Sequence, residues 1–166
     1  MRSDNGFARA CALASVFLLA VSVTACSKKP KNQAGLGTAG PVVPGTPREF
    51  AAVAGDRVYF STDSTQLSSQ AQTTLRGQAK WLSRYPGYTI TIEGHADERG
   101  TREYNIALGA RRATAVRSYL SGLGINSSRV RTVSYGKERP VAVCNDISCW
   151  SQNRRAVTAL ARAPGS

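Results

Sequence analysis

A charged loop and one arginine within an apolar helix face are the residues of this sequence best suited to bind a ligand. The loop, residues 94–101, reads GHADERGT and places Asp97 and Arg99 between glycines. Arg112 follows on a predicted helix, in a row of residues spaced by four. The other members of that row are apolar or aromatic: Tyr104, Leu108, Val116 and Leu120. A guanidinium stays charged, and burying it without an anion costs several kcal/mol, so we expect a carboxylate to face Arg112.

That carboxylate has two candidate sources. Asp97 is the nearest one in the chain, and an internal Arg112–Asp97 ion pair would need no ligand. The alternative is a ligand that carries both a carboxylate and an ammonium. Arg112 and the free N–H groups at the helix start would hold its carboxylate, and Asp97 would hold the ammonium. The loop lies between a strand end and a helix start, where binding sites are common, which favours the ligand.

The chain offers little for catalysis or for metal binding. An enzyme would recruit His95 and Asp97 as base and acid, beside a Ser or Thr nucleophile. His95 is the only histidine, and the sequence has neither Gly-x-Ser-x-Gly nor His-Glu-x-x-His. A zinc site built from His95, Cys144 and Cys149 lacks a fourth obvious ligand. We therefore expect no catalytic residues, no metal and no cofactor.

The N-terminal residues have the layout of a lipoprotein signal. Arg2 and Arg9 precede a weakly apolar run, 10–25, that is shorter than the roughly 20 residues needed to span a bilayer. The run ends in Val-Thr-Ala-Cys, which resembles the bacterial lipoprotein box. We therefore expect residues 1–25 to be removed and Cys26 to carry lipid. Ser27, where an Asp would retain the protein at the inner membrane, implies by the same resemblance passage to the outer membrane.

A tether and one domain follow the candidate lipid site. Residues 26–52 are rich in Gly, Pro, Ala and Lys without apolar periodicity, and we expect a flexible linker that spans roughly 26 Å on average. Residues 53–163 would form the domain. The formal charge of +12 admits nucleic acid, anionic lipid or an acidic polymer as partner, but export removes nucleic acid from the expected partners.

Cys144 and Cys149 remain as an even pair within the domain, because Cys11 leaves with the leader and Cys26 would carry lipid. An oxidising compartment would let the pair form a disulfide. A loop this short contributes about 2 kcal/mol in the chain-entropy model, so the bridge would mainly stiffen residues 137–151.

The domain alternates strands and helices. Apolar residues recur at helical spacing up to Pro86-Gly87, and residues 88–93 alternate apolar and polar side chains with the period of a half-buried strand. The predicted strands are 58–60, 88–93, 130–135 and 156–161, and the predicted helices are 67–82 and 102–121. The order β-α-β-α-β-β predicts an α+β fold, with a mixed four-stranded sheet and both helices packed on one face.

Several separated motifs closely resemble the OmpA-like C-terminal domain family, in particular its peptidoglycan-associated lipoproteins. They are EGHADERGT at 93–101, YN at 104–105, RRA at 111–113, SYG at 134–136 and NRRA at 153–156. The resemblance covers about residues 53–161. It implies non-covalent binding to the diaminopimelate of the peptidoglycan stem peptide, by a domain that faces the periplasm and tethers the outer membrane to the cell wall.

The same resemblance implies the binding residues and a second partner. The ligand-binding residues would be Asp63, Asp97, Arg99, Leu108 and Arg112, with Asp97 and Arg112 clasping the ammonium and the carboxylate of diaminopimelate. Thr62 departs from the family, in which Phe often precedes that first aspartate. The second partner would be the periplasmic β-propeller protein of the Tol system, in envelope integrity and cell division. The segment from Cys144 to Cys149 is longer than in enteric members, and the resemblance assigns no role to residues 137–151.

Overall fold

The computed structural model describes residues 42–162 of the chain. The predictions for the signal sequence, for Cys26 and for most of the linker fall outside this range. Within it, no helix combines the length and the apolar character that a membrane span requires.

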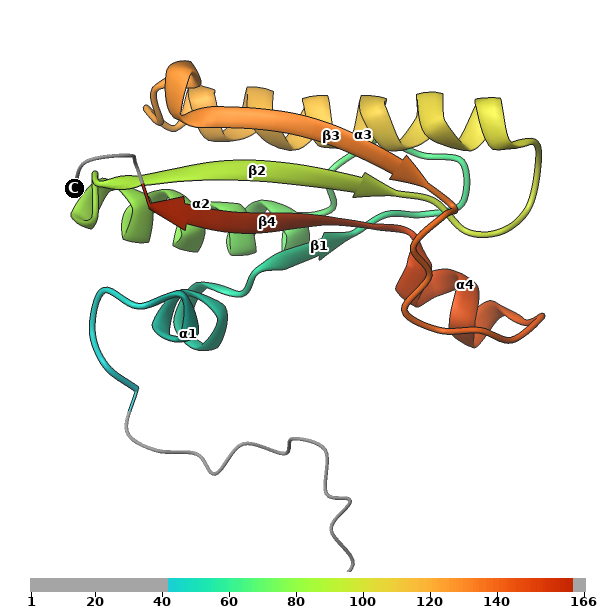
Figure 1. The fold of residues 1–166 in the computed structure, drawn as a ribbon, viewed down its shortest axis with the longest axis horizontal. Coiled ribbons are helices and arrows are strands. Elements are labelled where there is room, and N and C mark those ends of the chain that lie inside the picture. Colours follow the sequence, from blue (N-terminus) through green and yellow to red (C-terminus); the bar gives the residue numbers. More distant parts are fainter. Residues whose placement is uncertain (1–41, 163–166) are drawn as a thin grey trace, which may run out of the picture. The chain divides into compact units, whose positions relative to one another are not determined.

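A mixed four-stranded sheet forms the frame of the domain (Figure 1). In sequence order its strands are β1 Arg57–Tyr59, β2 Tyr88–His95, β3 Val130–Gly136 and β4 Arg155–Arg162. Across the sheet the order is β1-β4-β2-β3. β2 runs parallel to β3 and antiparallel to β4, which also pairs antiparallel with β1. A parallel pair of strands needs a crossover connection, usually a helix. The mixed four-stranded sheet confirms the predicted α+β fold.

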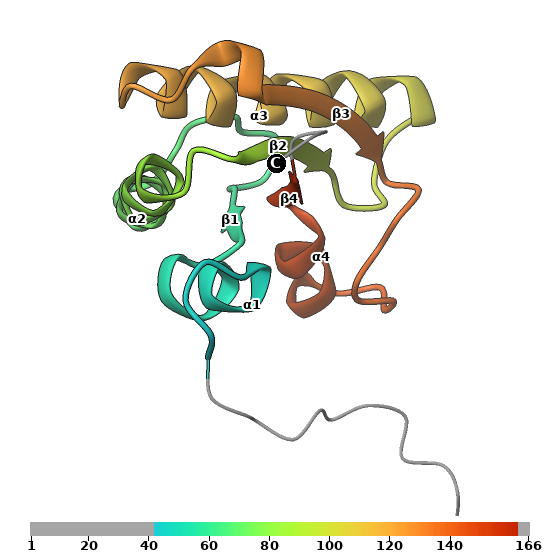
Figure 2. The same ribbon diagram turned by 60° about the vertical axis from the view of Figure 1, so that its left-hand side comes forward.

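Two long helices, α2 Ser69–Arg84 and α3 Arg102–Gly122, cover one face of this sheet (Figure 2). Each begins at a hydroxyl cap, because the side chains of Ser68 and Thr101 accept a backbone N–H of the first turn at 3.2 Å. The apolar side of β2, which alternates with its polar side, packs against both helices. The fully buried apolar side chains at this contact include Leu75, Leu82, Ile90, Ile92, Val116 and Leu120.

The folded domain begins before residue 53, earlier than expected. A short helix, α1 Pro47–Glu49, leads into a π-helical turn, η1 Phe50–Ala54. Phe50 is 1% exposed, and its ring centroid lies 5.1 Å from that of Trp81 on α2. The linker predicted over 26–52 therefore ends before residue 47, because Phe50 supplies a large aromatic side chain to the core.

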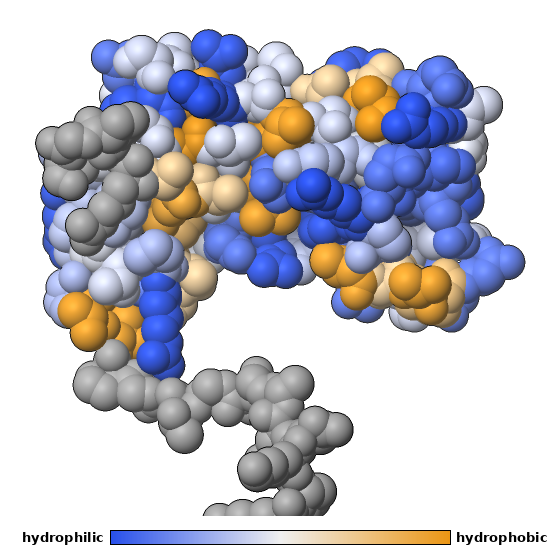
Figure 3. All heavy atoms as spheres, in the orientation of Figure 1, coloured by the Kyte–Doolittle hydropathy of each residue, from blue (hydrophilic) through white to orange (hydrophobic). Residues whose placement is uncertain are grey.

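A seven-residue helix, α4 Ile147–Asn153, lies between β3 and β4 and is absent from the predicted order of elements. Cys144 and Cys149 are joined in a disulfide, with their Cα atoms 5.6 Å apart, so their sulfurs are not free to bind a metal. Exposed apolar side chains gather around this bridge, at Val141, Val143 and Ile147, and the face drawn in Figure 3 shows hydrophobic surface over α4. A helix of two turns is too short to be predicted from the spacing of its apolar residues.

The closest approach between α3 and the sheet is made by two glycines. A Cβ atom built on Gly94 in β2 would overlap the backbone carbonyl oxygen of Gly109 in α3. A Cβ on Gly109 would in turn lie 2.8 Å from the carbonyl oxygen of Gly94. Since both obstacles are backbone atoms, only glycine at these positions lets the helix lie this close to β2.

Candidate functional site

A pocket of about 380 Å³ lies where the loops after β1 and β2 meet the first half of α3. Its lining residues are Thr62, Asp63, Asp97, Arg99, Gly100, Tyr104, Asn105, Leu108 and Arg112. The structure therefore brings all of the ligand-binding residues expected from the sequence to one cavity. Their assembly depends on α3, which contributes Leu108 and Arg112 from the face that packs on the sheet.

The Asp97 carboxylate is held by two arginines. Arg99 donates to it through Nε at 3.1 Å and Nη2 at 2.6 Å, and the Arg99 backbone N–H adds a bond of 3.3 Å. Arg154 donates through Nη1, also at 3.3 Å. Burial alone would raise the pKa of Asp97, but these hydrogen bonds outweigh it and hold the pKa below its ordinary value. Asp97 is therefore ionised at neutral pH.

Arg112 is fully buried and bonds to backbone carbonyls, not to Asp97. Its Nε, Nη1 and Nη2 atoms donate to the carbonyl oxygens of Ser64 at 2.9 Å, His95 at 2.8 Å and Ser61 at 3.1 Å. The internal Arg112–Asp97 ion pair that the sequence left open does not form, since the ion-pair partners of Asp97 are Arg99 and Arg154. The expectation that a carboxylate of the chain faces Arg112 is therefore wrong for the described residues.

Two consequences follow from the carbonyl contacts of Arg112. Two of these carbonyls lie in the loop after β1 and the third is that of His95, the last residue of β2, so one side chain on α3 ties that loop to the end of β2 beside the pocket. The carbonyls are also neutral, so the guanidinium remains a cation beside the cavity. Burial lowers the pKa of Arg112 to about 10, against the opposing field of Asp97, and the group stays protonated at neutral pH.

The rim of the pocket is formed in part by Asp63 and Tyr104. Asp63 has a φ of 52°, an uncommon conformation for a residue with a side chain, and the Tyr104 hydroxyl donates to its carboxylate. Tyr104 is 43% exposed, so the apolar row predicted on α3 does not begin at this position. Asn105 is buried instead, and its Nδ2 donates to the Arg99 carbonyl at 2.7 Å.

Sequence reasoning missed the roles of Asn105 and Arg154. Both occur in motifs that carry the family resemblance, but neither motif names a partner for them. Arg154 precedes β4, and its Nε also donates to the Phe60 carbonyl at 3.1 Å. Because its contact with Asp97 spans 57 residues, only the sheet order, with β4 beside β2, brings the two together.

His95 ends β2, two residues beyond the predicted end of that strand, and is buried instead of lying in the predicted loop 94–101. Neither ring nitrogen has a hydrogen-bond partner among the described residues, and Glu93 Oε2 lies 3.9 Å from Nε2. Burial, with the nearby charges of Arg155 and Arg139, lowers the pKa of His95 to about 4. The imidazole is therefore neutral at physiological pH.

The depressed pKa of His95 predicts a loss of stability in mild acid. Between pH 6.5 and about 4 the unfolded chain binds a proton on His95 that the folded chain does not, so the free energy of unfolding falls as the pH falls. We expect a decrease of about 3 kcal/mol over this window, measured by urea unfolding at a series of pH values. His95→Gln, which cannot titrate, should flatten the profile above pH 4.5, and an unchanged slope would assign the effect to other groups.

Both the sequence and the fold of this chain are similar to those of known proteins. The sequence matches the OmpA family over residues 59–154. It is 58% identical to a peptidoglycan-associated lipoprotein of Agrobacterium fabrum, over 87% of this chain and 85% of the relative. A protein of the same name from Rhizobium meliloti is 60% identical, over 91% and 87%. The crystal structure of the peptidoglycan-associated lipoprotein from Burkholderia pseudomallei superposes with a TM-score of 0.62 at 46% identity, covering 64% of this chain and 90% of that one.

Proposed function

We propose that this chain, which belongs to the OmpA family, binds peptidoglycan without covalent attachment. Within that family it belongs to the peptidoglycan-associated lipoproteins. The OmpA family is not a family of enzymes, and we assign the chain no catalytic activity. The observation that supports binding at the pocket is its charge pattern. An ionised Asp97 and a buried Arg112 without a carboxylate partner line the same cavity.

The ligand that we propose is the diaminopimelate of the stem peptide, whose side chain ends in one ammonium and one carboxylate. Asp97 would accept hydrogen bonds from the ammonium, and Arg112 would donate to the carboxylate through N–H groups that the three carbonyls do not use. The pocket and the arginine behind Asp97 hold three guanidinium groups against two carboxylates, so the carboxylate of the ligand meets an excess of positive charge. The five groups are Arg99, Arg112, Arg154, Asp63 and Asp97.

We further propose that lipid on Cys26 anchors the chain in the outer membrane, with the domain in the periplasm and the Tol-system β-propeller protein as a second partner. The Val-Thr-Ala-Cys box supports the anchor, and the family supports the partner. A few charge-assisted hydrogen bonds, less the cost of association, suggest an affinity per stem peptide of about millimolar to micromolar. Tethering beside a lattice of repeated stem peptides raises the effective concentration, so the attachment persists although each contact is weak.

Sedimentation with insoluble peptidoglycan tests the proposal. The mature chain made without lipid, by Cys26→Ser, should sediment with peptidoglycan that contains diaminopimelate. Free meso-diaminopimelate at millimolar concentration should release it, because the free amino acid offers the same ammonium and carboxylate. Nα-acetyl-L-lysine amide is the matched control ligand, since it has the side-chain ammonium without any free carboxylate, and we expect it to release several-fold less protein.

Three results would contradict this function. Equal release by Nα-acetyl-L-lysine amide and diaminopimelate would remove the carboxylate from recognition. Retention that disappears at high salt, for wild type and pocket variants alike, would indicate general electrostatic adhesion of a chain with a formal charge of +12. Soluble fragments liberated from the peptidoglycan would indicate a hydrolase.

A further inference from the structure

The segment between β3 and β4 reaches the loop after β2 through several side chains. Trp150 on α4 donates from Nε1 to Glu98 Oε1 at 3.0 Å. Lys137 donates from Nζ to the carbonyl oxygens of Glu98 at 3.1 Å and Gly100 at 2.8 Å. These contacts are made with the residues on either side of Arg99 in the sequence. A segment without an assigned role therefore holds the loop that forms one wall of the pocket.

Trp150 makes a second contact, with the arginine that holds Asp97. The guanidinium carbon of Arg99 lies 4.3 Å from the centroid of the Trp150 ring, a cation–π distance. The same guanidinium donates two hydrogen bonds to Asp97. The Arg99 side chain is 40% exposed, so without the indole its long chain would sample other rotamers. The ring and the carboxylate together fix its orientation.

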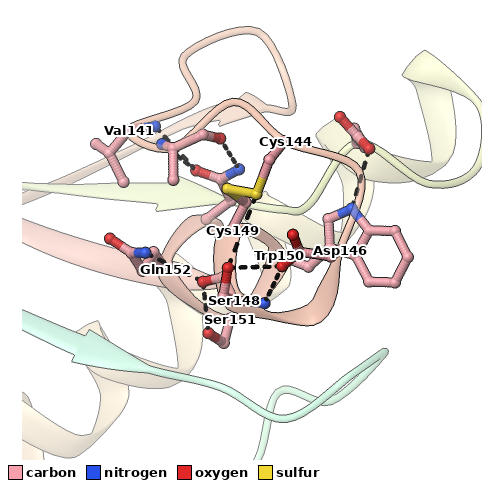
Figure 4. Close-up of a disulfide and its surroundings, with 11 residues drawn as sticks. Val141, Cys144, Asp146, Ser148, Cys149, Trp150, Ser151 and Gln152 are labelled. Atoms are coloured by element: carbon pink, nitrogen blue, oxygen red, sulfur yellow. Dashed lines mark hydrogen bonds between the residues drawn. A yellow bond between two sulfur atoms is a disulfide. The ribbon is translucent and has the colours of Figure 1, made fainter.

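The position of Trp150 depends in turn on the disulfide and on Asn153. A seven-residue helix is not stable by itself, because nucleation is costly and few bonds repay it. The Cys144–Cys149 bridge closes the loop onto the first turn of α4, and Figure 4 shows the bridge beside that turn with the Trp150 indole nitrogen bonded to a carboxylate. Asn153 is buried, and its side-chain amide forms hydrogen bonds of 2.8 to 3.2 Å with the backbone of Val141 and Ala142.

We propose that α4 and its disulfide are a positioning element for the pocket, with Trp150 as the residue that orients Arg99 and, through it, Asp97. This inference rests on the proposed function, since it names what sets the affinity of the same site. Ligand affinity then depends on the oxidation state of Cys144 and Cys149. Cys149 is buried, but neither cysteine belongs to the main core, so opening the bridge would loosen α4 while the sheet and the two long helices keep their own core.

Four variants separate positioning from a general effect on folding. Trp150→Ala removes the ring and the indole N–H, and Trp150→Phe keeps a ring for Arg99 while losing the bond to Glu98. The double variant Cys144→Ser, Cys149→Ser removes the bridge, and wild type treated with a reductant should match it. Ile147→Ala is the control on the same helix, because Ile147 is 61% exposed and lines no part of the pocket.

Diaminopimelate competition for sedimented peptidoglycan gives the affinity of each variant. We expect Trp150→Ala and the double serine variant to bind about three- to tenfold more weakly than wild type, the range of a lost cation–π contact and its ordering effect. Trp150→Phe should recover most of this loss, and Ile147→Ala should bind as wild type does. Thermal unfolding of Trp150→Ala should stay close to that of Ile147→Ala, because α4 lies outside the main core.

A second measurement reads the position of Arg99 without any ligand. In ¹⁵N spectra of the full mature chain, the Arg99 Nε–H should give a slowly exchanging resonance that shifts and exchanges faster in Trp150→Ala and after reduction. If Trp150→Ala and the reduced wild type both give the Arg99 resonance and the competition curve of untreated wild type, the positioning role is wrong. If wild type is not retained on peptidoglycan at all, the proposed function is wrong, and the Arg99 resonance still decides whether α4 orients this side chain.

Discussion

Arg112→Ala is expected to weaken retention on diaminopimelate-type peptidoglycan by about ten- to a hundredfold, the effect of one lost charge-assisted contact. The variant should also lose about 3 kcal/mol of unfolding free energy, because one buried and two partly buried carbonyls lose a charged donor at once. Those carbonyls belong to Ser61 and Ser64 in the loop after β1 and to His95 at the end of β2. Sedimentation measures the first effect and urea unfolding the second.

Two further variants keep this result interpretable. Arg117→Ala removes the same charge from the same helix, and the Arg117 side chain makes no hydrogen bond or ion pair within residues 42–162, so both measurements should match wild type. Arg112→Lys keeps the charge but cannot reproduce a planar fork with three carbonyl partners, so it should fold better than Arg112→Ala and still bind at least tenfold more weakly than wild type, about the cost of one charge-assisted bond. Wild-type retention by Arg112→Lys would remove the guanidinium from ligand recognition.

Arg112 shows which features of this site could be predicted from the sequence and which could not. Its place in an apolar row indicated that it is buried and needs partners, and both inferences agree with the structure. The identity of the partners was not accessible. Backbone carbonyls carry no side-chain signature, and they are aimed at Arg112 only because the loop after β1 and the end of β2 converge on α3. The expected partner was therefore a carboxylate, the acceptor that a sequence offers to balance the charge of a guanidinium.

Long periodic segments were predicted closely, and short or context-dependent ones were not. The alternation in residues 88–93 and the apolar face of 67–82 place β2 and α2 within a few residues of their observed bounds. α4 has no pattern of its own, and its shape depends on a disulfide, a cap at Asp146 and the buried Asn153. Phe50 was predicted to be part of the linker, because only the folded core shows that its side chain is buried.

Gly94→Ala is expected to destabilise the domain by about 3 kcal/mol, at the upper end of overpacking costs, and to lower the melting temperature by roughly 10 °C. The new Cβ would overlap the Gly109 carbonyl oxygen, a backbone atom that cannot rotate away. α3 must then move off β2, and it carries Leu108 and Arg112 with it. Retention on peptidoglycan should therefore fall together with stability, as measured by thermal unfolding and sedimentation.

Gly122→Ala is the matched control for this prediction, because the same atom is added at a glycine of α3 with nothing within 4 Å of it. Replacing a helical glycine with alanine in open space should raise the unfolding free energy by about 0.5–1 kcal/mol, through the lower entropy of the unfolded chain and the better helix propensity. The two substitutions thus have opposite signs for one added methyl group. If both variants melted at the wild-type temperature, the direct backbone contact between α3 and β2 would not be what fixes the spacing of the pocket.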